Sequence, residues 1–221
     1  MFQQLVPIYF MPGMAASSKI FEHIKLPEDQ FEIHLLEWVV PTDNESISDY
    51  ALRMTQNITH DNVVLIGVSF GGILVQEMSK HVKVRKLIIV SSVKSMYELP
   101  KRMKLAKLTK AYKLLPTKLV GNLDVLAKYA FGNNVIKRID LYKKYLSVND
   151  SKYLSWAIEQ VVCWGQESII PEIVHIHGEN DAVFPINHIS NCITVKNGSH
   201  IMIINKYKWF NANLPRIILE N

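Results

Sequence analysis

Ser69 is the residue in this sequence best placed for covalent chemistry. It lies in the hexapeptide GVSFGG at 67–72, which follows an apolar run at 63–66 and precedes a segment with helical spacing. On such a sharp strand-to-helix turn the serine backbone is strained, and glycines two residues before and after it are needed because a Cβ there would collide. The pattern therefore predicts an exposed nucleophile at the carboxyl end of a strand. The alternative is a glycine-rich turn that only connects two elements.

A nucleophilic serine needs a general base and a carboxylate that holds this base in the right tautomer. Asp181 lies in HGENDAVFP at 177–185, directly after an apolar segment typical of a strand. Its loop is expected at the same sheet edge as Ser69, because parallel strands end at a common edge. Asp181 is therefore the predicted acid, and Glu179 of the same loop is the alternative.

His200 is the predicted base. It ends the tetrapeptide NGSH at 197–200, after a short strand-like segment and before the last helical segment. The chain order of the three candidates is serine, aspartate, histidine, and parallel topology would bring their loops together. A helix-capping role is the alternative for His200. Two other histidines, His175 and His177, lie within the strand before the aspartate loop and are interpreted as structural.

The elements that must position these residues alternate along the chain. Strands are expected at 5–11, 32–38, 63–66, 86–90, 172–177 and 192–195. Helical spacing marks a short helix after Ser17, an amphipathic helix from Ser46 to about His60, a helix at 73–82 and a closing helix at 201–220 that Pro215 should kink. Such alternation predicts a mostly parallel sheet of about six strands, with helices on both faces.

The alternation stops between 93 and 168, where the sequence has helical spacing and no convincing strand. This segment holds 14 Lys and Arg residues against six acids, so the excess positive charge belongs to one insertion. Trp156 and Trp164 lie at helical spacing with Ala157 and Val161; they could line an apolar acyl pocket or simply dock the insertion on the core. The lysines are interpreted as a solvated outer face, with binding to anionic lipid or a carrier protein as the sharper alternative.

Length and composition favour a single domain. The chain has 221 residues, 48% of them hydrophobic, and its core is expected at 1–92 and 169–221 with the helical insertion at 93–168. Cys163 and Cys192 have no paired spacing, which favours a reducing, cytoplasmic setting. No apolar run is long enough for a signal segment or a membrane span.

The net charge of +5 is not accompanied by a nucleic-acid-binding module, so a nucleic-acid partner is not expected. No cluster of His, Cys or Asp shows the spacing of a metal site, and the sequence lacks a GxGxxG motif for a nucleotide. His34 and His60 are interpreted as solvated or capping positions. The sequence therefore predicts neither a metal nor a cofactor.

Taken together, the GVSFGG elbow, the HGENDAVFP stretch and the GSH at 198–200 make the chain resemble the α/β-hydrolase family over essentially its whole length. The resemblance implies that the backbone N–H groups of Phe70 and Met14 form an oxyanion hole. Pro12-Gly13 stands where the family usually has His-Gly. The insertion at 93–168 takes the place of the family's cap.

The same resemblance implies the activity. A serine hydrolase of the carboxylesterase or thioesterase kind would cleave an ester, thioester or related acyl bond of a small-molecule substrate through an acyl-enzyme, without a cofactor. A catalytically weak small-molecule receptor, an acyltransferase and cofactor-free perhydrolysis are the alternatives on the same fold. Contact with a membrane surface is the less favoured expectation for the basic insertion.

Overall fold

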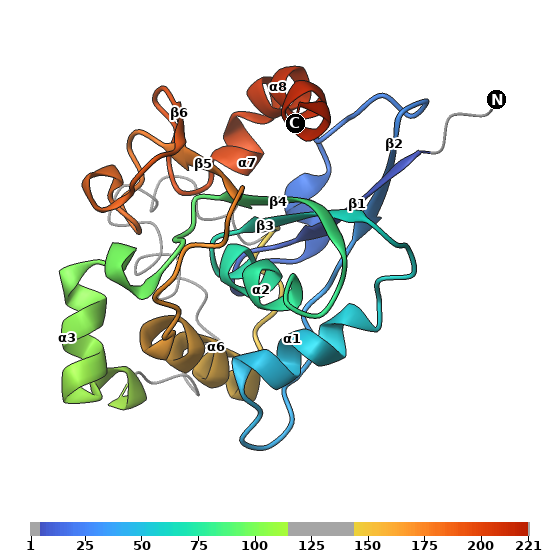
Figure 1. The fold of residues 1–221 in the computed structure, drawn as a ribbon. Helices are drawn as coiled ribbons and strands as arrows, with labels where there is room; N and C mark the ends of the chain where they lie inside the picture. The colour runs from blue at the N-terminus through green and yellow to red at the C-terminus, as the bar shows by residue number, and fades with distance from the viewer. Residues whose placement is uncertain (1–4, 115–143, 221) are drawn as a thin grey trace.

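Six parallel strands form one sheet in the order β2-β1-β3-β4-β5-β6 (Figure 1). The structure, a computed structural model, describes residues 5–114 and 144–220. The strands are β1 (Val6–Met11), β2 (Phe31–Leu35), β3 (Val63–Val68), β4 (Val84–Val90), β5 (Val174–Gly178) and β6 (Ile193–Val195). The predicted fold class is thereby confirmed. Strand β2 ends three residues earlier than expected, and β3 and β4 are longer than expected.

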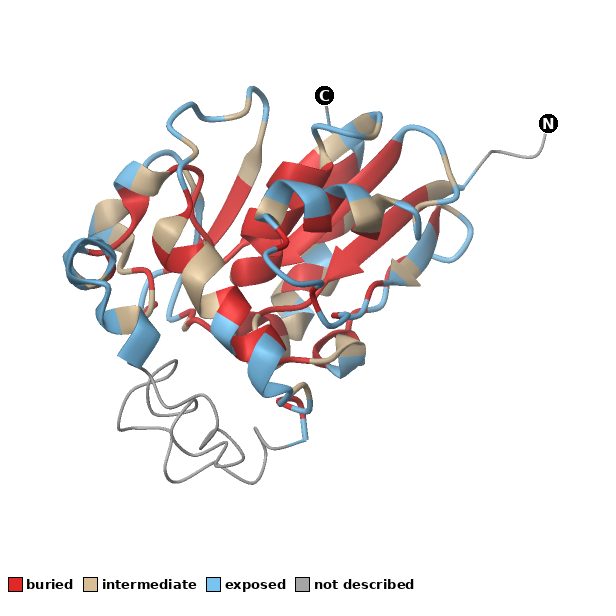
Figure 2. Cartoon of the chain, turned by 90° about the horizontal axis from the view of Figure 1, so that it is seen from below, coloured by how far each residue is buried: buried red, intermediate tan, exposed pale blue. Residues whose placement is uncertain are grey.

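Helices cover both faces of this sheet. Helices α1 (Ile47–Thr55) and α2 (Phe70–Met78) lie on one side of it, and α7 (Met202–Asn205) and α8 (Tyr207–Leu219) on the other (Figure 1). The short segments η1 (Ser18–Phe21) and η6 (Ile186–His188) are 3₁₀ turns. All of β3 is buried, as expected for a central parallel strand covered on both faces, and Figure 2 shows the buried residues gathered in the sheet and the helices against it.

Helix boundaries differ from the prediction in three places, one of which is α2, which spans Phe70–Met78 rather than 73–82. Ser46 caps α1 as expected, with its Oγ accepting a hydrogen bond from the Asp49 N–H at 3.1 Å, but α1 ends at Thr55 rather than near His60. The expected closing helix is two helices that meet at Lys206, whose φ of −114° is not helical. Pro215 lies inside α8, which continues through it. The interruption therefore falls nine residues before the proline that was expected to cause it.

The described parts of the insertion are helical. They contain η2 (Met96–Glu98), α3 (Lys101–Thr109), η3 (Ala111–Leu114) and α6 (Ser151–Cys163), and residues 93–114 and 144–168 contain no strand. The rest of the predicted helical insertion, 115–143, lies outside the described residues. In the described part of the chain, no helix has both the length and the apolar character needed to cross a bilayer.

Candidate active site

Ser69 occupies the turn between β3 and α2 in a strained backbone conformation, with φ 53° and ψ −120°. Strand β4 holds this turn in place. The Ser69 N–H donates to the Val90 carbonyl at 2.9 Å, and the Ser69 carbonyl accepts a hydrogen bond from the Ser92 hydroxyl at 2.7 Å. A positive φ in a residue other than glycine persists only where the surroundings impose it. Here the end of β4 holds the Ser69 N–H, and Ser92, two residues after the strand, holds the Ser69 carbonyl.

The two elbow glycines are required by close backbone approach. A Cβ on Gly67 would lie 2.2 Å from the Gly71 carbonyl oxygen, and a Cβ on Gly71 would lie 2.3 Å from the Pro12 carbonyl oxygen. Both distances are far inside van der Waals contact with backbone atoms that cannot move aside. The glycine at 71 therefore brings the elbow directly against the loop after β1.

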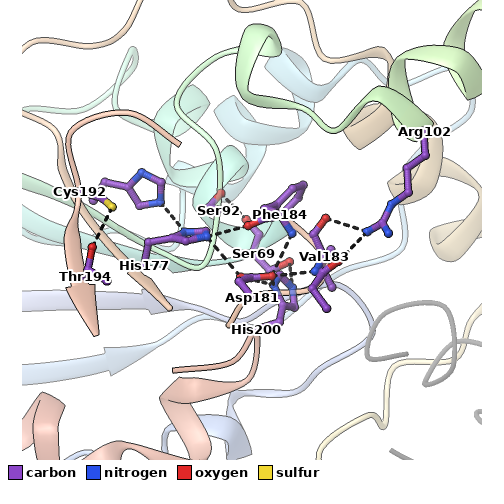
Figure 3. A network of polar contacts seen from close by, with 12 residues as sticks. Ser69, Ser92, Arg102, His177, Asp181, Val183, Phe184, Cys192, Thr194 and His200 are labelled. Atoms are coloured by element: carbon purple, nitrogen blue, oxygen red, sulfur yellow. Dashed lines mark hydrogen bonds and ion pairs between the residues drawn. The ribbon is translucent and has the colours of Figure 1, made fainter. Parts of the chain in front are cut away.

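His200 and Asp181 meet Ser69 at this edge of the sheet, as Figure 3 shows. The Nε2 atom of His200 lies 2.9 Å from Ser69 Oγ, and its Nδ1 atom lies 2.9 Å from Asp181 Oδ2. An ionised carboxylate can only accept hydrogen bonds, so the proton on the ring belongs at Nδ1 and Nε2 is left to accept the serine O–H. The structure thus brings the three predicted residues together in one hydrogen-bonded chain. Glu179, the alternative acid, instead accepts a hydrogen bond from the Asn197 N–H at 2.9 Å.

The buried carboxylate of Asp181 is held by its own loop. Its Oδ1 atom accepts hydrogen bonds from the N–H groups of Val183 at 2.8 Å and Phe184 at 2.9 Å. Burial alone would raise the pKa of Asp181, but the charge and hydrogen bond of His200, with the Phe184 N–H, outweigh it and keep the pKa below its ordinary value. Asp181 is therefore an anion that orients His200. From the insertion, Arg102 of α3 donates hydrogen bonds to two carbonyl oxygens of the same loop (Figure 3).

Backbone contacts join the acid loop to the base loop. The Asn180 N–H donates to the Gly198 carbonyl at 2.7 Å, and the Glu179 N–H donates to the Val195 carbonyl at 3.1 Å. A Cβ on Gly178 would lie 2.6 Å from the Gly198 carbonyl oxygen, so only glycine permits this approach. The loops that carry Asp181 and His200 are thus packed backbone against backbone.

Two buried histidines lie behind Asp181. His177 Nε2 bonds the Phe184 carbonyl at 2.8 Å, and His177 Nδ1 lies 3.0 Å from His175 Nε2. Burial lowers the pKa of both rings, that of His175 to about 2, so both are neutral at physiological pH. Their place inside the fold agrees with the structural role expected for them.

The two predicted oxyanion donors border the same cavity as Ser69 and His200. Met14 and Phe70 line a cavity of about 130 Å³ together with Ser69 and His200. The rest of its lining is almost wholly apolar and includes residues from the insertion, namely Met103, Tyr145, Leu146 and Val161. As the first residue of α2, Phe70 has an N–H without a partner inside its own helix.

Trp38 fixes the peptide group that carries the Met14 N–H. Its indole N–H donates to the Gly13 carbonyl at 2.8 Å, and its ring stacks on Phe70 with centroids 4.9 Å apart and planes at 5°. The Gly13–Met14 peptide is trans, so its N–H points away from its carbonyl and hence away from Trp38. Trp38 thereby contacts Phe70 and the carbonyl of the peptide group whose N–H belongs to Met14, and no sequence pattern indicated it.

Trp156 and Trp164 do not line the cavity. The Trp156 indole N–H donates to the Glu45 carbonyl at 2.7 Å, and the Trp164 indole N–H donates to the Glu77 carboxylate at 2.8 Å. Both rings are buried against the core. Among the described residues the two tryptophans therefore lie outside this cavity, and their contacts fit the alternative that they dock the insertion on the core. Val161, five residues after Trp156 on α6, lines the cavity instead.

Solved structures share this architecture. A hydrolase from Oleispira antarctica superposes with a TM-score of 0.74 at 14% identity, covering 99% of this chain and 93% of that one. A thermophilic esterase from Thermogutta terrifontis gives 0.68 at 12% identity (96% and 89%), and a bromoperoxidase from Bacillus anthracis gives 0.68 at 17% identity (99% and 93%). No protein-family model and no curated protein sequence matches the chain. The parallel sheet, the strand-to-helix elbow and these superpositions identify the fold of this chain as that of the α/β-hydrolases.

Proposed function

We propose that the protein is a serine hydrolase that cleaves an ester, thioester or related acyl bond through an acyl-enzyme. The observation that carries the proposal is the continuous hydrogen-bonded chain from Ser69 Oγ through His200 to Asp181, each link 2.9 Å long. These hydrogen-bonded side chains border an apolar cavity, where charge separation is costly unless fixed groups stabilise it. The hydrolases and esterases among the structural neighbours add support at the level of the fold.

The proton positions in the Ser69–His200–Asp181 hydrogen bonds determine how acylation would proceed. Ser69 Oγ attacks the acyl carbon while His200 Nε2 takes the serine proton, and the carbonyl π electrons move onto oxygen. Collapse of the tetrahedral intermediate breaks the bond to the leaving group, which receives that proton from His200. Water then repeats the sequence on the acyl-serine, which releases the acid and restores Ser69.

The transition state carries two new charges, and the site has a group for each. Asp181, an anion, faces the imidazolium that forms on His200. The N–H groups of Met14 and Phe70 are the donors assigned to the developing oxyanion, with Trp38 holding the first of the two peptides. Preorganised donors of this kind are usually the largest single contribution to catalysis of acyl transfer.

The cavity indicates the class of substrate. Its apolar lining, from Ile20 and Val68 of the core to Leu146 and Val161 of the insertion, suits a short hydrocarbon acyl group rather than a charged one. We therefore place the acyl chain in this cavity.

Labelling with a fluorophosphonate tests the nucleophile, and turnover of an ester panel tests the reaction. Intact mass and peptide mapping should place one adduct on Ser69, and Ser69→Ala should abolish both the adduct and turnover. An adduct on another residue would refute the assignment of Ser69. Labelling of Ser69 without turnover of any ester, thioester or lactone would instead favour the weak-receptor alternative.

A further inference from the structure

Glu32, His34 and His60 bring three metal-ligating side chains together at the edge of the sheet. Glu32 and His34 lie two residues apart on the edge strand β2, so their side chains leave the same face of the sheet. His60 belongs to the segment between α1 and β3. One ligand atom from each of the three residues lies within 4.8 Å of the other two. None of these residues belongs to the active site described above.

The distances within this cluster are close to those of a filled coordination shell. The Nε2 of His34 lies 3.0 Å from Glu32 Oε1, and the Nε2 of His60 lies 3.8 Å from Glu32 Oε2. In a tetrahedral zinc site with ligand bonds of about 2.0–2.1 Å, neighbouring ligand atoms are about 3.3 Å apart. Small rotations of these partly exposed side chains would therefore be sufficient to close the shell around an ion.

The ring nitrogen of His34 is an independent indication of a ligand. His34 Nε2 is buried and has no hydrogen-bond partner, since its approach to Glu32 lacks hydrogen-bonding geometry. The ring is held in this position by stacking on Tyr9 of β1, its register partner, with centroids 4.5 Å apart. A buried nitrogen with no partner is costly, and a bound cation would satisfy it.

Tyr9 also supports the metal-binding tautomer of His60. The Tyr9 hydroxyl lies 2.8 Å from His60 Nδ1 and 3.2 Å from Thr59 Oγ1, and it accepts a hydrogen bond from the Thr59 N–H at 3.1 Å. If Nδ1 carries the ring proton and donates it to Tyr9, the tyrosine can donate to Thr59 Oγ1 and every group is satisfied. The Nε2 atom of His60 then carries no proton, faces Glu32, and has a lone pair free to bind a metal ion. Partners of this kind orient the histidine ligands of metal sites.

We propose that Glu32, His34 and His60 bind one divalent transition metal ion of the zinc class, with water completing its coordination. Two imidazoles and one carboxylate suit such ions better than Mg²⁺ or Ca²⁺, which prefer an all-oxygen shell. The ion would tie the edge strand β2 to the segment that precedes β3. Its role is therefore structural, separate from the proposed hydrolase activity.

Calorimetric titration of the chelator-treated full chain with Zn²⁺ tests this site without reference to activity. One zinc ion per chain should bind, and zinc should raise the melting temperature. His34→Gln and His60→Gln should each weaken binding at least tenfold and remove the thermal shift. Tyr9→Phe should weaken binding by roughly tenfold, because only the supporting hydroxyl is lost.

The matched control is His23→Gln, because His23 Nε2 lies 3.5 Å from Glu22 in an exposed pair that is not part of a three-ligand cluster among the described residues. This variant should bind zinc as the unaltered chain does. Glu32→Gln is a second variant of a proposed ligand, for use if His34→Gln does not fold. It should remain folded because the Glu32 side chain is half-exposed. Two results would overturn the proposal. One is the absence of saturable zinc binding. The other is zinc binding that survives in both histidine variants, because the ion is then held elsewhere, for example at His200.

Discussion

Replacing Trp38 by phenylalanine isolates one hydrogen bond that acts on the proposed oxyanion hole. The change removes the indole N–H that donates to the Gly13 carbonyl and keeps an aromatic ring against Phe70. The Gly13 carbonyl still accepts a hydrogen bond from the Ala16 N–H at 3.1 Å, so it is not left unsatisfied. The expected effect is a looser Gly13–Met14 peptide rather than a lost donor.

The size of the effect follows from these contacts. A neutral hydrogen bond contributes about 0.5–1.5 kcal/mol net, which corresponds to about a 2- to 13-fold change in rate if it is realised only in the transition state. Loss of an entire oxyanion donor would cost about 10²–10³-fold. We therefore expect Trp38→Phe to lower kcat for a short-chain p-nitrophenyl ester about fivefold and to leave KM nearly unchanged.

Trp156→Phe is the matched control for this experiment. Trp156 is also buried, also donates its indole N–H to a backbone carbonyl, and also contacts the Phe70 ring, at 5.8 Å between centroids. It differs in that its acceptor is Glu45, outside the loop that carries Met14. The control should lose stability and keep kcat. Wild-type kcat in Trp38→Phe, or equal losses of kcat in both variants, would refute the positioning role of Trp38.

Three further predictions concern the triad, the cavity and pH. Asp181→Asn should stay folded, by circular dichroism, and lose roughly 10⁴-fold in turnover, while Glu179→Gln changes little; the reverse order would move the acid to Glu179. Val161→Phe should shift kcat/KM toward shorter acyl esters, and an unaltered chain-length profile would exclude this cavity as the acyl site. The folded-state pKa of His175 is about 2 against a usual 6.5, so between these values only the unfolded chain takes up this proton. The unfolding free energy in urea should therefore fall as pH drops below about 6.5, by up to about 1.4 kcal/mol per pH unit, and His175→Asn should flatten that slope.

Local sequence patterns predicted the fold and the three triad positions because each depends on short segments. The glycines around Ser69 are needed because a Cβ would collide with backbone inside the elbow or beside it, and they are visible within a six-residue segment. The loops of Asp181 and His200 follow recognisable strands. Parallel topology then fixes the edge at which all three meet. The boundaries of elements were less predictable, as the helix break at Lys206 in place of Pro215 illustrates.

Features that depend on contacts between distant segments escaped sequence reasoning. Trp38 acts on Gly13, 25 residues away, and no spacing rule links an indole to a loop carbonyl. The periodicity of Trp156 and Trp164 could not distinguish a cavity-lining side chain from a docking one, because both are buried and apolar. His34 and His60 lie on different elements with no ligand spacing, and only tertiary structure places them beside Glu32.

The backbone contacts around the candidate active site divide the proposed catalytic residues into two preassembled parts. Gly71 packs against Pro12, which brings the turn of Ser69 against the loop of Met14. Gly178 packs against Gly198, which brings the loop of Asp181 against that of His200. Within the triad, the link across these parts is the single hydrogen bond between His200 and Ser69. A displacement of β5 relative to β4 would therefore lengthen that bond and leave the contacts within each part intact. The proposed activity is therefore more sensitive to the relative position of the two parts than to the packing within either one.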